Sequence, residues 1–253
     1  MKLPKLENSL ARSWRVIYHS RYGMGRTVIF IKSLYGDLPL AVMVAGMALI
    51  GLWVSNIVYD RGVPNYVSRK IGHGAGGLAF LVSYAMASAW WPIIISVAFT
   101  ALLMAGHFMR PQTIRGVGGS GRSERILAEV YFPLTAVPVY AIAWLWLKRP
   151  EAAVACLLFM AWGDGVTGIV RAQVYKGPVK GMWGSVAMLA VCLCVSWVFI
   201  RPFWIGAIAS ILATVVEWSF GEYGVFKWAD DNWAVPAVSL IAVLGIMALN
   251  GNL

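Results

Sequence analysis

An aspartate lies inside an apolar stretch that is long enough to cross a membrane. Residues 152–170 contain no charged side chain other than Asp164, and three glycines lie within the run 163–168 around it. A carboxylate at membrane depth is costly unless it faces a polar cavity or a partner, and glycine lets other groups approach the backbone closely. We therefore take Asp164 as the first candidate catalytic and metal-binding residue. The alternative is a structural aspartate that caps a broken helix.

Three basic side chains stand at the start of another apolar run. Arg69, Lys70 and His73 are spaced so that they can share one face of a helix. Arginine binds phosphate through a fork of two hydrogen bonds, and lysine supplies a mobile point charge. The group predicts phosphate binding. The alternative is a basic membrane anchor beside a packing histidine.

Two cations follow Asp164, and acidic side chains come later. Arg171 and Lys180 lie one or more helical turns after the aspartate, Glu217 ends an apolar run, and Asp231 and Asn232 open the last one. Magnesium takes one or two carboxylates together with phosphate oxygens, so this set suits a metal–triphosphate site. We expect the acidic residues to join Asp164 around Mg²⁺. The alternative is that Asp231 and Asn232 cap the last helix.

The stretch 110–131 carries weaker signals. Its glycine-rich run 116–121 could cradle phosphates, but it lacks the Gly-Lys-Ser/Thr ending of a P-loop. Glu129, at the entrance of an apolar run, is the more specific polar candidate. Glu124 and Tyr131 are further polar candidates for the site.

The composition is that of an integral membrane protein. The chain has 253 residues, is 60% hydrophobic and 13% charged, and has a mean hydropathy of +0.71. We predict an all-α bundle of about eight transmembrane spans, with seven to nine as the range. The apolar runs are 38–59, 71–105 (two spans, with a turn at 89–92), 130–147, 152–170, 186–200, 203–216 and 233–249. The run 38–59 is too long for a signal peptide and lacks a cleavage site.

Residues 38–253 are expected to form a single transmembrane catalytic domain. Residues 1–37 are a basic, partly amphipathic N-terminal segment, which either lies on anionic lipid or serves as a tail of topological charges. The net charge of +10 is concentrated there and in short loops, which is typical of cytoplasmic loops and not of nucleic-acid binding. Cys156, Cys192 and Cys194 lie in apolar runs at spacings that fit neither a zinc site nor a disulfide framework.

The long connections predict where the chemistry takes place. They are 60–70, 108–129, 171–184 and 217–232, and each is separated from the next by two spans. All four should therefore emerge on one membrane face, and their Lys and Arg residues make that face cytoplasmic. The seven Lys and Arg before residue 38 would then lie on the opposite face if 38–59 crosses once, and the sequence leaves this conflict open.

Taken in order, these groups resemble the dolichol kinase / phytol kinase family of integral membrane lipid kinases. The resemblance covers about residues 61–240 and rests on an ordered set in which no single motif is specific. The matching positions are Arg69, Lys70 and His73; Gly163, Asp164 and Gly168; Lys180, Gly184 and Ser185; Glu217, Asp231, Asn232 and Pro236; and Arg122, Glu124, Tyr131 and Pro133. The chain departs from the family pattern at Trp183 and Gly181, and the glycines usually found around Arg171 are missing.

The resemblance implies a reaction. A kinase of this family would transfer the γ-phosphoryl group of CTP to the hydroxyl of a long isoprenoid alcohol or of diacylglycerol. Asp164, with Asp231 or Glu217 and with Asn232, would hold Mg²⁺, whereas Arg69, Lys70, Arg122, Arg171, Lys180 and Ser185 would bind nucleotide and phosphates. His73 or a carboxylate would accept the hydroxyl proton. The lipid tail would lie between spans, with its hydroxyl at the cytoplasmic interface.

Three other functions stay open. A phosphatidate-type cytidylyltransferase also combines an intramembrane Gly-Asp with CTP, but it would attack the α-phosphorus and release pyrophosphate. An ion-coupled membrane transporter would use Asp164 and Glu217 to carry protons or cations, although no repeated halves are evident. A membrane scaffold without enzymatic activity would use the same residues as topological charges and caps.

Overall fold

The computed structural model describes residues 33–118, 127–177, 179–220, 224–226, 230–251 and 253. Within these ranges the chain is a helical bundle without a β-sheet, and its only extended pairing is one bridge between Phe220 and Phe226. The predicted all-α class is therefore confirmed. The helices are α3 (Leu38–Asp60), α4 (Asn65–Ser83), α5 (Trp90–Met109), η1 (Pro111–Thr113), α6 (Ala128–Val139), η2 (Tyr140–Trp146), α7 (Pro150–Leu158), η3 (Phe159–Gly163), α8 (Asp164–Val170), η4 (Arg171–Tyr175), α9 (Met182–Phe199), α10 (Phe203–Ser219) and α11 (Asp231–Leu249).

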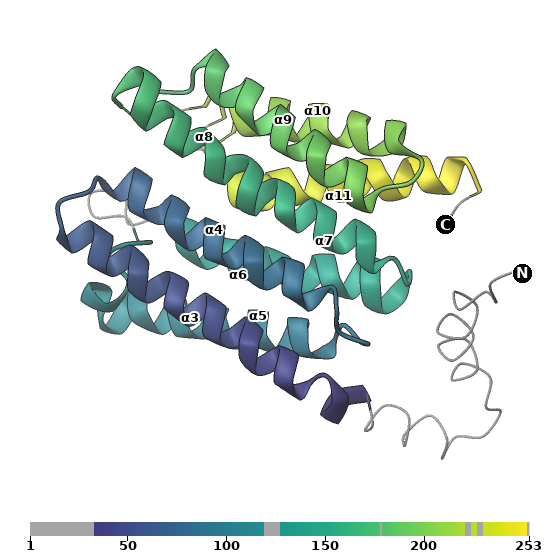
Figure 1. The fold of residues 1–253 in the computed structure, drawn as a ribbon, viewed down its shortest axis with the longest axis horizontal. Helices are drawn as coiled ribbons and strands as arrows, with labels where there is room; N and C mark the ends of the chain where they lie inside the picture. Colours follow the sequence, from purple (N-terminus) through teal and green to yellow (C-terminus); the bar gives the residue numbers. More distant parts are fainter. Residues whose placement is uncertain (1–32, 119–126, 178, 221–223, 227–229, 252) are drawn as a thin grey trace, which may run out of the picture.

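Consecutive elements join into eight long rods in the described part of the chain, because η2 continues α6 and the elements from α7 to η4 form one helix (Figure 1). Six of these rods are long and apolar enough to cross a membrane, as expected of an integral membrane protein. The rod α10 is apolar but shorter, and α4 carries basic residues and glycines in its first half. The predicted number of eight spans stays a prediction.

The interior of the bundle is built around the rod Pro150–Tyr175. Every residue from 152 to 161 is fully buried, and α4, α9 and α11 all pack against this rod. The outer helices expose large apolar side chains such as Trp53, Val97 and Trp197. An apolar surface of this kind is stable against lipid and not against water.

The four long connections lie at one end of the bundle, on the left in Figure 1. This is the arrangement that the alternation of spans predicts. Side chains tie the connections together there: Asn65 donates to the backbone carbonyls of Arg115 and Gly118 at 2.9 and 2.7 Å, and Ser68 donates to that of Gly116 at 2.7 Å. We call this the loop end of the bundle.

The glycine-rich loop packs on the helices in its described part. The Gly116 N–H donates to the Asn56 side chain at 2.8 Å, and the Gly118 N–H donates to the Ile114 carbonyl. These two N–H groups are thus already used within the protein, which favours the packing interpretation over a phosphate cradle. Residues 119–121 of the loop lie outside the described ranges.

The turn between α4 and α5 was predicted at 89–92, and this is wrong by several residues. The turn spans residues 84–89, and Trp90 already begins α5. The reason is a long-range contact: the buried carboxylate of Asp37 accepts hydrogen bonds from the N–H groups of Ala87 and Ser88 at 2.8 and 3.1 Å. Pro92 fits in the first turn of α5, where helix N–H groups need no acceptor within the helix.

Candidate active site

Asp164 lies near the loop end of the buried rod, directly after a π-helical turn. The turn η3 ends at Gly163, α8 begins with Asp164, and a second π-helical stretch begins at Arg171. A π turn places an extra residue in the helix and is common at functional sites because it changes which face the following side chains occupy. The Asp164 side chain is almost fully buried.

Lys70 and His73 of α4 meet the Asp164 carboxylate. Its Oδ2 atom lies 2.6 Å from Lys70 Nζ and 3.3 Å from His73 Nδ1. The hydroxyl of Thr167 donates to the Asp164 backbone carbonyl at 2.8 Å and lies 3.2 Å from the carboxylate Oδ1. The carboxylate that was unexpected in an apolar stretch therefore has a lysine, a histidine and a hydroxyl as neighbours.

Gly168 explains how the Lys70 side chain reaches Asp164. A β-carbon built at position 168 would lie 2.6 Å from the Lys70 Cγ and Cε atoms, closer than nonbonded carbons can approach. The lysine stem therefore passes directly over the backbone of α8. Thr167 and Gly168 were not assigned roles by their residue types alone, although Gly168 belongs to the ordered set of the resemblance.

A second group of charges surrounds Glu217, at the end of α10. The Glu217 side chain is fully buried, and its Oε1 atom accepts from Arg171 and lies 3.0 Å from Lys180 Nζ. The same lysine donates to the backbone carbonyls of Glu217 and Phe220 and lies 3.4 Å from the Asp231 carboxylate. Lys180 thus joins the end of α10 to the start of α11.

The two groups together bring three carboxylates into one place. Asp164, Glu217 and Asp231 each offer an oxygen atom, and these atoms all lie within 4.8 Å of one another. We call this set the carboxylate cluster. Buried polar atoms with no hydrogen-bond partner among the described residues occur on several of the predicted site residues: Glu217 Oε2, Asn232 Oδ1, Arg171 Nε and Ser185 Oγ. Such atoms are rare in stable interiors, and they are typical of sites that bind a ligand.

At the start of α11, one residue caps the helix and a different residue belongs to the carboxylate cluster. The cap is Asp230, whose side chain accepts from the Asn232 N–H at 2.9 Å, so the predicted alternative of a cap by Asp231 or Asn232 is wrong. Asn232 is buried, and its amide group donates to the Ala128 carbonyl at 3.0 Å. Asp231, released from capping, can face Lys180.

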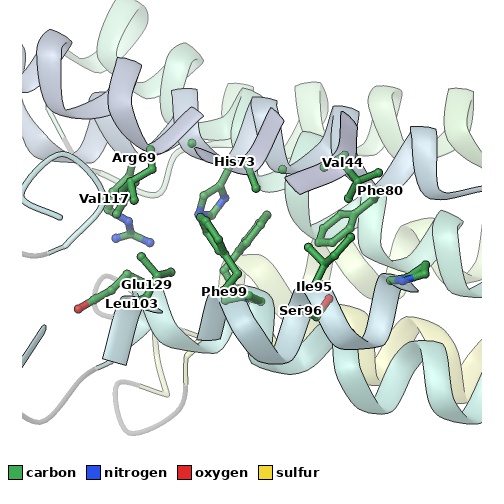
Figure 2. Close-up of a pocket in the computed structure, with 18 of the residues that line it drawn as sticks. Val44, Arg69, His73, Phe80, Ile95, Ser96, Phe99, Leu103, Val117 and Glu129 are labelled. Carbon is green, nitrogen blue, oxygen red and sulfur yellow. The ribbon is translucent and has the colours of Figure 1, made fainter. Parts of the chain in front are cut away.

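Arg69 and Glu129 lie in a different part of the site. Both are buried and line a cavity between α3, α4, α5 and α6 (Figure 2). Arg69 thus does not accompany Lys70 to Asp164, because consecutive helix residues point about 100° apart. Glu129 Oε1 lies 2.7 Å from His107 Nδ1, at the facing end of α5. Sequence reasoning missed His107, although a histidine ending one apolar run opposite a glutamate that opens the next was a usable signal.

The remaining predicted residues are not part of the cluster. Tyr131 is half-buried on α6, and its side chain makes no hydrogen bond or ion pair with the described residues. Arg122 and Glu124 lie outside the described ranges.

These features can be compared with known proteins. The chain is similar to a phytol kinase. The curated phytol kinase of Synechocystis sp. (strain ATCC 27184 / PCC 6803 / Kazusa) is 28% identical over 194 residues, which cover 72% of this chain and 80% of that protein. No family model matches the chain, and no solved structure matches it. The similarity supports assignment to the lipid kinases and leaves the phosphoryl donor and the acceptor unassigned.

The two departures from the family pattern have a structural explanation. Trp183 lies in the first turn of α9 with 55% of its surface exposed, away from the buried carboxylates. A β-carbon at Gly181 would lie 2.2 Å from the Tyr175 ring, so this ring occupies the space that a larger residue would need. The departures therefore concern the outer side of the 171–184 connection.

We expect the substitution Trp183→Glu to leave almost unchanged the nucleotide use that the family resemblance implies. An exposed position away from a functional site changes free energies by less than about 0.5 kcal/mol, which corresponds to roughly twofold in an apparent Michaelis constant. The check is the Michaelis constant for the nucleotide, measured with the lipid at saturation. A larger shift in either direction would place position 183 in the nucleotide site.

Proposed function

We propose that this chain is a membrane lipid kinase. It transfers the γ-phosphoryl group of CTP to the hydroxyl of a polyprenol-type alcohol of the dolichol, phytol or geranylgeraniol class, or to diacylglycerol. The observation that carries the proposal is the meeting of the three carboxylates with Lys70, Arg171 and Lys180, contributed by helices far apart in the sequence. Phosphoryl transfer depends mainly on positioning and on neutralising charge, and this set provides both. CTP as donor rests on the family resemblance alone.

The residues of the cluster fit a magnesium ion. Mg²⁺ prefers oxygen ligands and is bound by one or two carboxylates together with phosphates. The cluster offers three carboxylates, and the buried Glu217 Oε2 atom has no hydrogen-bond partner among the described residues. Asp164, Glu217 and Asp231 would hold it, with the Asn232 side chain beside them. A bound ion of this kind neutralises the charge of the phosphates.

The neighbouring side chains have distinct proposed roles. Lys180 and Arg171 bind the phosphates of the nucleotide, and the buried Ser185 hydroxyl donates a further hydrogen bond. Lys70 stabilises charge on the transferred group. In the transfer, the acceptor oxygen forms a bond to the γ-phosphorus, the bond to the β-phosphate oxygen breaks, and CDP leaves.

His73 is the proposed acceptor of the hydroxyl proton. It lies between Asp164 and the cavity of Figure 2, and the Asp164 carboxylate orients its ring from a distance of 3.3 Å. Arg69 lies with Glu129 at the same cavity, so it is better placed for the hydroxyl end of the acceptor than for the nucleotide. The loop end would face the cytoplasm, as the positive charge of the connections favours.

The test is transfer of label from two forms of CTP. Purified protein with Mg²⁺ receives CTP labelled with ³²P at the γ or at the α position, together with prenols, diacylglycerol or phosphatidic acid. Label in the lipid from the γ position alone supports the kinase. Label from the α position alone means a cytidylyltransferase, and no transfer from CTP, ATP or GTP favours transport or a scaffold.

A substitution tests the proposed role of Lys180. Lys180→Ala should raise the apparent Michaelis constant for CTP by about tenfold or more, since a hydrogen bond to a charged group contributes about 1.5–3 kcal/mol. The constant for the lipid should change much less. The control is Lys176→Asn in the same connection, where the native lysine is exposed and has a left-handed backbone that asparagine tolerates. An effect confined to the lipid would remove Lys180 from the phosphate site.

A further inference from the structure

A narrow cavity runs along one side of α4, enclosed by α3, α5 and α6. Its volume is about 80 Å³, and its walls are almost entirely apolar. On each of the four helices, the lining residues lie at successive distances from the loop end. Counted from the loop end, the series are Arg69 to Phe80 on α4, Leu52 to Val44 on α3, Leu103 to Pro92 on α5, and Glu129 to Tyr140 on α6–η2.

The two ends of the cavity differ in chemistry. Figure 2 shows Arg69 and Glu129 at the loop end, with Phe80, Ile95 and Ser96 at the other end. At this deep end the Tyr140 hydroxyl, which is fully buried, lies 2.7 Å from the hydroxyl of Ser83, so a hydrogen bond holds the floor in place. The cavity therefore has a polar mouth, an apolar shaft and a fixed floor.

His73 belongs to the cavity and to the carboxylate cluster at once. It lines the shaft just inside the mouth, its ring packs 4.5 Å from that of Phe132, and its Nδ1 atom lies 3.3 Å from Asp164. A hydroxyl at this point of the cavity would lie next to His73. An apolar tail attached to that hydroxyl would extend into the apolar shaft of the cavity.

From this geometry we infer that the cavity holds the single isoprenoid tail of the acceptor and that its depth limits the length of the tail. The inference rests on the proposed kinase function and selects among its acceptors. The shaft from Arg69 to Phe80 covers 11 residue steps of α4, or roughly 16 Å at 1.5 Å per residue. One shaft takes one tail, which excludes the two-tailed diacylglycerol. The empty volume is small, so side chains such as Phe99 and Phe132 turn aside when a tail enters.

The deep end provides a matched pair of substitutions. Ser96 lines the cavity and is 6% exposed, whereas the next residue, Val97, faces outward with 51% of its surface exposed. Ser96→Trp fills the deep end and should lower kcat/KM for geranylgeraniol and phytol relative to farnesol by at least about tenfold, the cost of displacing apolar groups from a pocket. Val97→Trp adds the same bulk outside and should leave this ratio unchanged.

A second matched pair of substitutions lies about halfway along the shaft. Ala48 of α3 lines the cavity, and the neighbouring Leu49 is exposed. Ala48→Phe should shift the preference further, from farnesol toward geraniol, while Leu49→Phe should not. The two pairs are independent, so a variant of one pair that fails to fold, as judged by size-exclusion chromatography and melting in detergent, leaves the other to decide.

The outcomes separate the inference from the proposed function. Transfer of the γ label to phytol and geranylgeraniol, with length preferences that follow the depth of the substitution, is the expected result. A wild-type protein that phosphorylates prenols with the same preference in all four variants overturns the cavity as the tail site and leaves the kinase standing. Phosphorylation of diacylglycerol or of dolichol in preference to the shorter prenols also overturns it. Absence of γ-phosphoryl transfer to any acceptor overturns both.

Discussion

Asp164→Asn should lower kcat by about a hundredfold to a thousandfold or more, with the protein still folded and inserted. The change keeps the shape of the side chain and removes the charge that Lys70, His73 and the proposed Mg²⁺ all share. Removing one preorganised electrostatic group from an active site typically has an effect of this size. The measurement is the rate of γ-phosphoryl transfer at saturating CTP and lipid over a series of Mg²⁺ concentrations.

The matched control is another buried aspartate. Asp37 is as deeply buried as Asp164, but it lies at the opposite end of the bundle, where it holds the turn before α5. Asp37→Asn should lower the melting temperature and leave kcat close to that of the wild type. Normal turnover in the Asp164 variant would exclude Asp164 from the proposed metal site.

Glu217→Gln should destabilise the protein by about 3–5 kcal/mol and also reduce activity. The native carboxylate is fully buried between Arg171 and Lys180, and its removal leaves Arg171 with an uncompensated buried charge and Lys180 with the more distant Asp231 carboxylate alone among the described acidic side chains. Breaking a buried ion pair by removing one partner has a cost of this order. The measurement is thermal unfolding in detergent, and Glu151→Gln is the control. Glu151 pairs with Arg149 at 3.6 Å near the opposite end, where a partly exposed pair contributes about 0–1 kcal/mol.

A double substitution separates stability from catalysis at this position. Arg171→Met combined with Glu217→Leu removes both charges of one pair and should recover part of the lost stability, since an apolar pair of similar size can replace a buried ion pair. Activity should stay low, because the variant lacks one carboxylate of the cluster and one of the cations proposed to bind phosphate. If the double variant recovers full activity together with stability, the role of Glu217 is structural and not catalytic.

The sequence predicted which residues gather in the candidate site better than it predicted which cation each carboxylate contacts. A carboxylate such as Asp164 or Glu217 in an apolar run must find a cavity or a partner, so burial alone marks it as a candidate. Which cation it meets depends on how the helices are rotated. Lys70 reaches Asp164 whereas its neighbour Arg69 lines the cavity, and no periodicity within one helix distinguishes these two outcomes.

Contacts between distant segments account for the other differences. The position of the α4–α5 turn depends on Asp37, fifty residues earlier, and the cap of α11 falls on Asp230 and not on the two residues after it. The pair of His107 and Glu129 forms across a connection of about twenty residues. By contrast, the helical class and the gathering of the connections at one end follow from the lengths of apolar runs, which are local properties.

The carboxylate cluster has a consequence for how the protein is made. Asp164 is on the buried rod in the middle of the chain, whereas Asp231 opens α11, the last helix, which packs against α6, α7 and α10. During synthesis the rod enters the membrane before the helix that completes its surroundings exists. In a ribosome-bound chain whose α11 has not yet left the ribosome, Asp164 and Glu217 are therefore in place without Asp231, the third carboxylate of the cluster. The proposed metal site is complete only when the final helix docks, so a chain that ends before α11 is expected to have no activity.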